Sequence, residues 1–480
     1  MFSKSDKKTL LIYFGMALLF IYPLIQAGVF YRDDLDRSIT GQYGWRGLGR
    51  PVADILMKIL SASGHYNLDL FPYTMIASCL FLAATSLLLN RHLIKLNITN
   101  AKIVSALLIF NPFILQNIAY RYDCLGMSVA FFLATMAYTY HNSNAFKAIS
   151  VKLITGVLSL ALYQPCANIF IGLIAIDLIV IAIKKHVSFR ESIALIARKA
   201  VLFISFYLVY ILLFSPKNNS RSELISLNTE GLAHLSGTLN SLKELTLSYF
   251  YNPVYIYFII PIVIICIFMG IHYYKQKESP LFFIFYGFIS LFIFTISLMG
   301  PTLFLKDAPV FPRTLVSFSV ILIIIAIPVM HFAPRLKYAA LIPVITVFAF
   351  SAQLSNTMKS QQEYEDFVFN MIAKDIASHK NITSIRTVGG LNLNERAKLL
   401  IENKPSIGYF VFPATEFLAS FQLINKGLPQ TLHGYGNEQE NKDVLANMMN
   451  KGILPGSSNE YYSLFISDST AVVVLGRNDF

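Results

Sequence analysis

The chain has 480 residues, of which 55% are hydrophobic and only 14% are charged. Soluble globular chains carry about 25% charged residues, so this composition excludes an ordinary soluble enzyme. Apolar runs of about 20 residues recur, long enough to cross a hydrocarbon core of about 30 Å as helices. The net charge of +12 does not indicate a nucleic-acid partner, because Lys and Arg are spread between the apolar runs rather than gathered on one face.

The first apolar run extends from Thr9 to Phe30 and follows the basic segment KSDKK. It is too long for a signal peptide and no small-residue cleavage site follows it, so we expect an uncleaved span with a cytoplasmic amino terminus. The sequence predicts about eleven spans in all. The further ones are expected at residues 68–89, 103–119, 124–141, 149–163, 166–183, 200–214, 254–273, 280–299, 315–332 and 338–356.

The connections between these spans alternate in charge. One set is basic and contains few acids, so the positive-inside rule places it in the cytoplasm. Its basic residues are Arg91, Lys95, Lys102, Lys147, Lys152, Lys184, Lys185, Arg190, Arg198, Lys199, Lys275, Lys277, Arg335 and Lys337. The other set then faces outward and comprises the first loop (31–67), Tyr120–Asp123, Gln164, 215–253, 300–314 and everything after residue 357.

The first outward loop begins with the acidic stretch FYRDDLDR, in which Arg32 precedes Asp33, Asp34 and Asp36. Clustered carboxylates raise one another's pKa, which suits a general base. A charge cluster within one turn of a span's end is costly unless it is used or paired. We therefore expect the three carboxylates to be catalytic and Arg32 to shape their site, although a solvated start of the loop would give the same pattern.

Residues 51–62, within this loop, are predicted to form an amphipathic helix that starts at Pro51, a residue suited to the first helical position. Such a helix beside membrane spans is expected to lie in the membrane interface. Packing onto the protein's own loops is the alternative. Its apolar positions are Val52, Ile55, Leu56, Ile59 and Leu60.

A second polar group, Tyr120, Arg121, Tyr122 and Asp123, lies between two apolar runs with almost no loop around it. Arg121 and Asp123 could form a structural ion pair. Alternatively, Arg121 could hold a lipid-linked phosphate, because its planar fork matches phosphate oxygens. The turn at Tyr163 and Gln164 could face the same cavity, or be a plain turn.

Arg50 and Arg313 are further cations on the outward side. Each could bind an anionic lipid head group or serve as a local cap. The sequence contains no phosphate-binding glycine-rich loop, no HExxH spacing and no GxSxG motif, so no cofactor is identified. An acidic cluster is compatible with a divalent metal, but a free carboxylate base needs none, so metal dependence is left open.

After Thr357 the composition becomes more polar, which predicts a transmembrane domain over 1–356 and a small outward α/β domain over 357–480. A helix is expected at 361–380 with Phe367, Ile372 and Ile376 inward. Short β-rich runs punctuated by Gly and Pro predict strands. They lie at 382–388, 407–412, 461–466 and 471–475.

The order of these motifs resembles the Gtr-type O-antigen glucosyltransferases, the serotype-converting enzymes of the glucosyltransferase II family. The resemblance covers residues 1 to about 190 well and the rest mainly in layout. Its motifs are the acidic loop YRDDLDR, then GRP followed by an amphipathic helix, then NP with YRYD, then YQP.

The resemblance implies a GT-C-like enzyme of the bacterial inner membrane, with its carboxyl-terminal domain in the periplasm. The donor would be undecaprenyl-phosphate glucose and the acceptor the O-antigen glycan of lipopolysaccharide. Asp33 or Asp34, with Asp36 as the third choice, would be the base of a single displacement. Arg121, Arg50 or Arg313 would stabilise the leaving phosphate. We expect the carboxyl-terminal domain to help read the acceptor, with Tyr409, Phe410 and Tyr435 as candidates.

Two other functions fit a polytopic membrane protein. A lipid-linked glycan flippase or other transporter would show internal symmetry and charges near mid-membrane, and neither is found in the sequence. An O-antigen polymerase would place arginines in large later outward loops. The loop 215–253 contains Lys217, Arg221 and Lys243, so this alternative stays open at this point.

Overall fold

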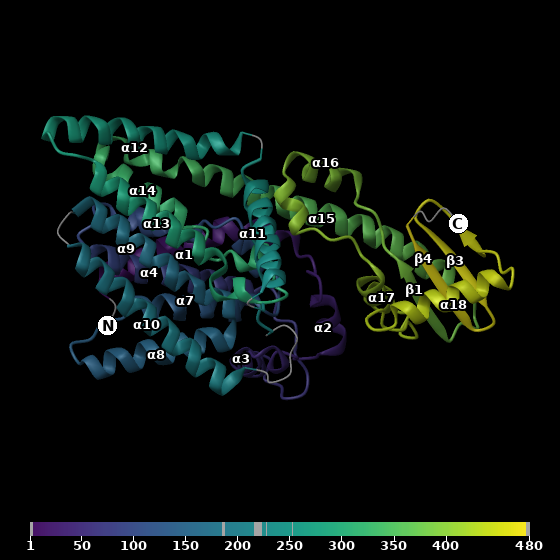
Figure 1. Ribbon diagram of the computed structural model, residues 1–480. Helices are drawn as coiled ribbons and strands as arrows, with labels where there is room; N and C mark the ends of the chain where they lie inside the picture. The colour runs from purple at the N-terminus through teal and green to yellow at the C-terminus, as the bar shows by residue number, and fades with distance from the viewer. Residues whose placement is uncertain (1–2, 185–187, 216–222, 227, 252, 477–480) are drawn as a thin grey trace. The chain divides into compact units, whose positions relative to one another are not determined.

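A computed structural model describes residues 3–184, 188–215, 223–226, 228–251 and 253–476. The chain separates into two compact units, each made of segments that are distant in sequence (Figure 1). The membrane unit consists of Met1–Gln26, Tyr43–Ser63 and Asp69–Ala352. The second unit consists of Ala27–Gln42, Gly64–Leu68 and Gln353–Phe480.

Among the described residues, eight helical segments are long and apolar enough to cross a membrane, which confirms a polytopic helical membrane protein. Three runs that the sequence predicted as spans are shorter than this, so the predicted number of eleven is not reached. The eight segments are α1 (Lys4–Ala27), α4 (Tyr73–Lys95), α8 (Ala145–Leu162), Gln164–Lys184 with α9 (Ile169–Lys184), α10 (Phe189–Phe214), α12 (Val254–Gln276), Leu281–Phe304 with α13 (Leu281–Met299), and Pro334–Ala377 with α15 (Ile342–Ala377).

One of the three shorter runs has a local cause. The run predicted at 103–119 is interrupted by Asn111-Pro112 and becomes α5 (Ala101–Ala106), a 3₁₀ turn (Leu107–Ile109) and α6 (Ile114–Ala119). Proline cannot donate a backbone hydrogen bond and breaks the helical ladder. The other two are α7 (Cys124–Thr139) and α14 (Val320–Phe332).

The break at Asn111 is compensated by hydrogen bonds to a distant segment. The Asn111 Nδ2 donates to the carbonyl oxygens of Leu315 and Val316, both at 2.9 Å. Asn111 is fully buried. Backbone groups inside a membrane have to be satisfied within the protein, and this side chain satisfies the two carbonyls just before α14.

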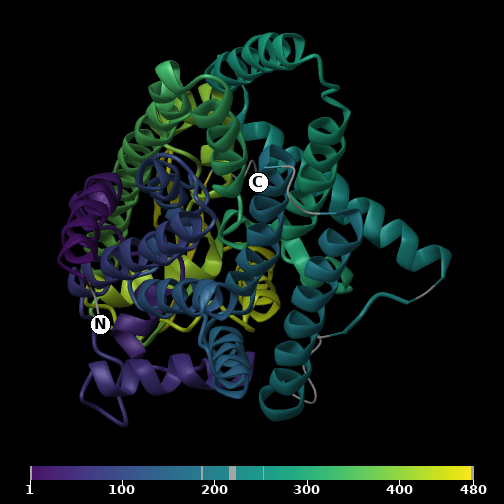
Figure 2. The same ribbon diagram turned by 90° about the vertical axis from the view of Figure 1, so that its left-hand side faces the viewer.

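Helix α9 is the centre of the membrane unit and α10 and α12 lie at its edge. The most apolar window of Gln164–Lys184 is 89% buried, whereas the corresponding windows of α10 and α12 are each 17% buried. A helix that is apolar all round and exposed on most of its surface faces lipid. Helix α1, in purple, lies at another edge (Figure 2). It contacts α15, where the Ser351 hydroxyl donates to the carbonyl oxygen of Phe20 at 2.6 Å.

The predicted outward loop 215–253 contains a helix, α11 (Thr229–Tyr249), that the sequence analysis did not anticipate. The helix was missed because most of its residues are polar. Its apolar stripe ends in Leu242, Leu245 and Tyr249, which are buried. The Tyr249 ring packs edge-on against Phe113, Phe318 and Phe350. Lys217 and Arg221, named for the polymerase alternative, lie outside the described residues.

The second unit is built on a four-stranded sheet in the order β1-β4-β3-β2, which confirms the predicted α/β character of this part. Strand β1 (Ser384–Gly389) pairs in parallel with β4 (Thr470–Leu475), and β4 pairs antiparallel with β3 (Tyr462–Ser467). The short β2 (Ser457–Ser458) pairs antiparallel with β3. The crossover from β1 to β4 contains α16 (Glu395–Asn403), α17 (Glu416–Asn425) and α18 (Glu438–Asn450).

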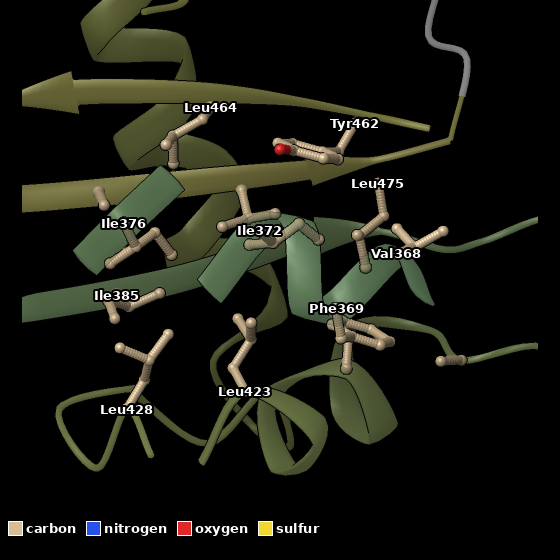
Figure 3. Packing of buried hydrophobic residues seen from close by; sticks show 14 of the residues in the cluster. Val368, Phe369, Ile372, Ile376, Ile385, Leu423, Leu428, Tyr462, Leu464 and Leu475 are labelled. Atoms are coloured by element: carbon tan, nitrogen blue, oxygen red, sulfur yellow. The ribbon is translucent and has the colours of Figure 1, made fainter. Parts of the chain in front are cut away.

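Successive residues of β4 serve opposite faces of the sheet, as the pleat requires. Ala471, Val473 and Leu475 join a core that includes Phe369 and Ile372 of α15. Figure 3 shows this core, in which side chains of α15 such as Phe369 and Ile372 lie among strand residues and Leu423 of α17. Val472 and Val474 join a second core with Leu445 and Met448 of α18. Helices therefore cover both faces of the sheet: α15 and α17 on one face and α18 on the other.

Helix α15 is continuous from Ile342 to Ala377, where the sequence analysis predicted a span at 338–356 and a separate helix at 361–380. The residues between contain no Gly or Pro to end the helix, so the change in composition marks a change of surroundings. Ile372 and Ile376 are buried as expected, but Phe367 is 53% exposed and Phe369 takes its place in the core.

The strand predicted at 407–412 is also wrong. Residues Pro405–Tyr409 form a 3₁₀ helix, with Ile407 and Phe410 buried on one side of it. Pro405 suits the first position of a helical turn, and apolar residues three apart fit a helical turn rather than the alternation of a strand.

The core packing predicts that Ile372→Ala will loosen the sheet. A large-to-small change in a core costs about 2–5 kcal/mol, and about 3 kcal/mol corresponds to roughly 100-fold faster opening. Hydrogen exchange of the full chain should therefore show β3 and β4 amides exchanging on that order faster. Leu399→Ala is the control, because Leu399 is 59% exposed. Equal exchange in both variants would contradict the assigned core.

Candidate functional site

The acidic stretch forms the short helix α2 (Asp34–Thr40), which Gly41 ends. Gly41 has φ of 67°, and a Cβ there would lie 2.8 Å from the Tyr66 ring, so only glycine fits without strain. Its carbonyl oxygen accepts a hydrogen bond from the Asn67 backbone N–H at 2.8 Å. The segment 64–68 is thereby joined to the end of α2 inside the second unit.

The three carboxylates of the acidic stretch differ in accessibility. The Asp33 side chain is 40% exposed and pairs with Arg37 Nη2 at 3.4 Å. Asp34 is fully buried, and one of its oxygens accepts the Tyr31 backbone N–H at 3.3 Å. Asp36 is 8% exposed. Asp33 is therefore the most accessible of the three predicted catalytic carboxylates.

Asp36 is held by neighbours that follow it in the sequence. Its carboxylate accepts hydrogen bonds from the Thr40 hydroxyl at 3.3 Å and from the Gln42 side-chain amide. Burial raises the pKa of Asp36, against the opposing effects of Thr40, Arg37 and His433. Because Arg37 and His433 both act on it, Asp36 lies between its own helix and residues near the carboxyl terminus.

The second unit thus contains contacts between the acidic stretch and the carboxyl-terminal segments. Helix α2 packs against α17, and the Arg32 guanidinium lies over the Phe412 ring at 4.2 Å. The sequence analysis assigned Arg32 a site-shaping role without a partner. No sequence signal connects Arg32 to Phe412, because about 380 residues separate them.

In the membrane unit, Arg50 contacts the turn that the sequence analysis named at Tyr163 and Gln164. Its Nε donates to Gln164 Oε1 at 3.0 Å, and its guanidinium lies 4.6 Å from the centre of the Tyr163 ring. Gln164 is fixed in turn by Leu48 and Tyr210, because its Nε2 donates to the Leu48 carbonyl at 3.1 Å and to the Tyr210 hydroxyl at 2.7 Å.

Arg121 forms a salt bridge with Asp69. The sequence suggested Asp123 as its partner instead. The Arg121 Nη1 lies 3.0 Å from Asp69 Oδ2, and its guanidinium lies 4.3 Å from the centre of the Phe71 ring. Asp123 instead accepts a hydrogen bond from the Trp45 indole Nε1 at 2.7 Å. Residues two apart around the turn at Tyr122 point to different partners, which sequence proximity alone does not show.

Arg313 is anchored from both its backbone and its side chain. Its backbone N–H donates to Gln116 Oε1 at 2.9 Å, and its carbonyl accepts from Asn117 Nδ2 at 3.1 Å. The guanidinium donates to the Tyr120 hydroxyl and lies 5.4 Å from the centre of the Tyr120 ring. Gln116 and Asn117 were not singled out in the sequence, although amides in an apolar run are a usable signal of a buried polar contact.

The membrane unit brings several of the predicted residues to one place. Arg50, Arg313 and Asp123 all lie close enough to the Tyr163 phenol to interact with it electrostatically. Arg121 has other partners, Asp69 and Phe71. We call Arg50 and Arg313 the arginine cluster. It combines guanidinium groups with tyrosine faces, an arrangement that favours cation–π contact and planar anion recognition.

The predicted amphipathic helix is α3 (Pro51–Leu60), with Pro51 at its first position. Asp54 is buried and lies 3.0 Å from both Arg46 Nε and Lys58 Nζ, while Ile55 and Ile59 are 46% and 70% exposed. The acid therefore faces the protein and the isoleucines face outward, as a helix in a membrane interface would require.

Comparison with known proteins agrees with this membrane architecture. The family model for the glucosyl transferase GtrII matches residues 22–330. A Salmonella phage P22 protein, described as an uncharacterized 55.3 kDa protein in the gtrB 5′ region, is 24% identical over 434 residues, which cover 82% of this chain and 85% of the phage protein. No solved structure matches the chain significantly.

The fold defines the class of this protein as a polytopic helical membrane protein. The chain belongs to the GtrII glucosyl transferase family, and is thus a membrane glycosyltransferase. The match extends from α1 to α14 and includes the acidic stretch, Trp45 and the whole arginine cluster.

The contact between Trp45 and Asp123 can be tested by fluorescence, because Trp45 is the only tryptophan of the chain. Asp123→Ala leaves the buried indole N–H without its carboxylate, at a cost of about 1–3 kcal/mol. We expect a shift of the emission to shorter wavelength and a lower melting temperature in detergent. Asp69→Ala, which removes a carboxylate that contacts Arg121, should leave the emission in place. An unchanged emission in Asp123→Ala would contradict the contact.

Proposed function

We propose that this protein transfers glucose from undecaprenyl-phosphate glucose to the O-antigen glycan of lipopolysaccharide, on the periplasmic side of the bacterial inner membrane. The match to a glucosyl transferase family favours glucosyl transfer over the transport and polymerase alternatives. The charge pattern of the connections supports an amino terminus in the cytoplasm and an outward acidic loop.

The observation that carries the donor class is the environment of Arg50. This half-buried cation has the neutral partners Gln164 and Tyr163. A guanidinium at the end of membrane spans is costly unless it meets an anion, and its fork matches two phosphate oxygens. A polyprenyl phosphate supplies such an anion on a lipid chain. The membrane unit that holds Arg50 would face that chain through α10 and α12.

We assign the general base to Asp33. A base has to reach the proton that it abstracts, and the Asp33 carboxylate is the most exposed of the three. Arg37 Nη2, 3.4 Å away, fixes the orientation of this carboxylate. Asp34 and Asp36, both buried, are assigned to holding α2 in shape.

The proposed reaction is a single displacement. The acceptor hydroxyl gives its proton to the Asp33 carboxylate while its oxygen forms a bond to the anomeric carbon of glucose. The bond from that carbon to the phosphate oxygen breaks, and its electron pair stays on the undecaprenyl phosphate. Charge develops on this phosphate, and guanidinium groups such as that of Arg50 would stabilise it. The anomeric configuration is inverted.

The base assignment predicts the outcome of Asp33→Asn. The amide cannot take the proton, so the transfer rate should fall by about 10²- to 10⁴-fold while binding of undecaprenyl-phosphate glucose is unchanged. Radiolabelled glucose transfer in membranes measures the rate. Glu363→Gln is the matched control, since its side chain is 66% exposed. Full activity of Asp33→Asn would reject the assignment. Loss of transfer in Asp34→Asn or Asp36→Asn alone would move it to that residue.

The donor assignment predicts that Arg50→Ala weakens binding of undecaprenyl-phosphate glucose by about 10- to 100-fold, the value of a lost charged hydrogen bond. Binding is measured with the purified protein in detergent, using undecaprenyl phosphate as the competitor. Arg46→Ala is the control in the same loop, because Arg46 pairs with Asp54, which keeps Lys58. Equal donor affinity of both variants would remove Arg50 from the phosphate site.

A further inference from the structure

The second unit carries a row of aromatic rings that leads from its interior to its surface. Phe421 is buried, and its ring lies 5.0 Å from His433 and 5.3 Å from Phe417. The Phe417 ring lies 5.7 Å from Tyr435. Tyr435 is 76% exposed. Phe417 and Phe421 lie four residues apart on one face of α17, as neighbours on a helix surface do.

The segment that carries His433 and Tyr435 is fixed in place. The Gly434 backbone N–H donates to the Ser420 hydroxyl at 3.0 Å, and a Cβ at Gly434 would lie only 2.2 Å from the Glu416 carbonyl oxygen. The Asn437 side chain donates to the His433 carbonyl at 2.9 Å. The exposed side chains of His433 and Tyr435 are therefore held in place by a backbone that packs closely on α17.

This surface adjoins the acidic helix within the same unit. Helix α2 packs on α17, and His433 is close enough to Asp36 for an electrostatic interaction. The Arg32 guanidinium covers the Phe412 ring, four residues before α17 begins. Asp36 and the proposed base Asp33 lie one helical turn apart around the start of α2.

The chemistry of this surface fits a pyranose ring. An exposed tyrosine on a rigid support offers a large flat face at low entropic cost. The C–H groups on one side of a sugar ring carry partial positive charge and are attracted to the negative face of an aromatic ring. An imidazole and carboxylates at the edge of such a face can bind the sugar hydroxyls.

We propose that Tyr435 and His433, supported by Phe417, bind the acceptor glycan in the second unit, with a sugar ring stacked on Tyr435. This inference rests on the proposed function, because an acceptor whose hydroxyl reaches Asp33 also has to contact the surface beside α2. It differs from the expectation drawn from sequence, which named Phe410, a fully buried residue. Tyr435 remains from that set, and His433 is new.

The test compares acceptor and donor kinetics in the full chain. The probe is O-antigen oligosaccharide released from lipopolysaccharide, with undecaprenyl-phosphate glucose as the donor. Tyr435→Ala should raise the KM for the oligosaccharide about tenfold with little change in kcat or in donor KM, as loss of one stacking contact would. Tyr435→Phe should keep the wild-type KM, because the ring remains. His433→Ala should also raise the acceptor KM.

The control is Leu454→Ala, since Leu454 is 82% exposed in the same unit. An unchanged acceptor KM in Tyr435→Ala, with normal transfer by the wild type, would overturn this proposal and leave the proposed function standing. Weaker binding of Tyr435→Ala to anionic lipid vesicles with an unchanged acceptor KM would overturn it in favour of a lipid contact. Absence of transfer by the wild-type chain would overturn the proposed function, and direct oligosaccharide binding by the wild type and Tyr435→Ala would then decide the glycan surface separately.

Discussion

Polar groups inside a membrane have to find partners within the protein, and this constraint shapes the membrane unit. The helical run is interrupted at Asn111-Pro112, and the Asn111 side-chain amide donates hydrogen bonds to two carbonyls that precede α14. A few residues later Gln116 and Asn117 bind the backbone of Arg313. Irregular backbone at this depth is tolerated only where protein surrounds it. Polar side chains a few residues after the break therefore position a cation of the arginine cluster.

The constraint explains why the arginine cluster is so fully fixed. Each guanidinium of the cluster lies over an aromatic ring: Arg50 over Tyr163 and Arg313 over Tyr120. Such contacts hold a cation without neutralising it, so a negatively charged ligand still gains from binding. A site fixed before its ligand arrives also loses less entropy when the ligand binds.

Much of the fold could be predicted from the sequence, because it depends on local patterns. Apolar runs predicted the membrane class, and short β-rich runs predicted β1, β3 and β4 to within two residues. Positions that depend on distant contacts could not be predicted. Nothing near Arg121 indicates that its partner is Asp69 rather than Asp123. Likewise, Arg32 meets Phe412 and Asp36 meets His433 only after the chain has folded.

The second unit is assembled from pieces at the two ends of the sequence, and this has a consequence for its biosynthesis. Helix α2 is translated early, whereas its packing partner α17 is translated near the end of synthesis. At about 5–20 residues per second, the acidic stretch waits on the order of tens of seconds for that partner. During this interval α2 is too short to be a stable helix by itself. The carboxylates therefore acquire their final arrangement only when the ribosome has finished the chain, so an incomplete protein is not expected to have an ordered acidic stretch.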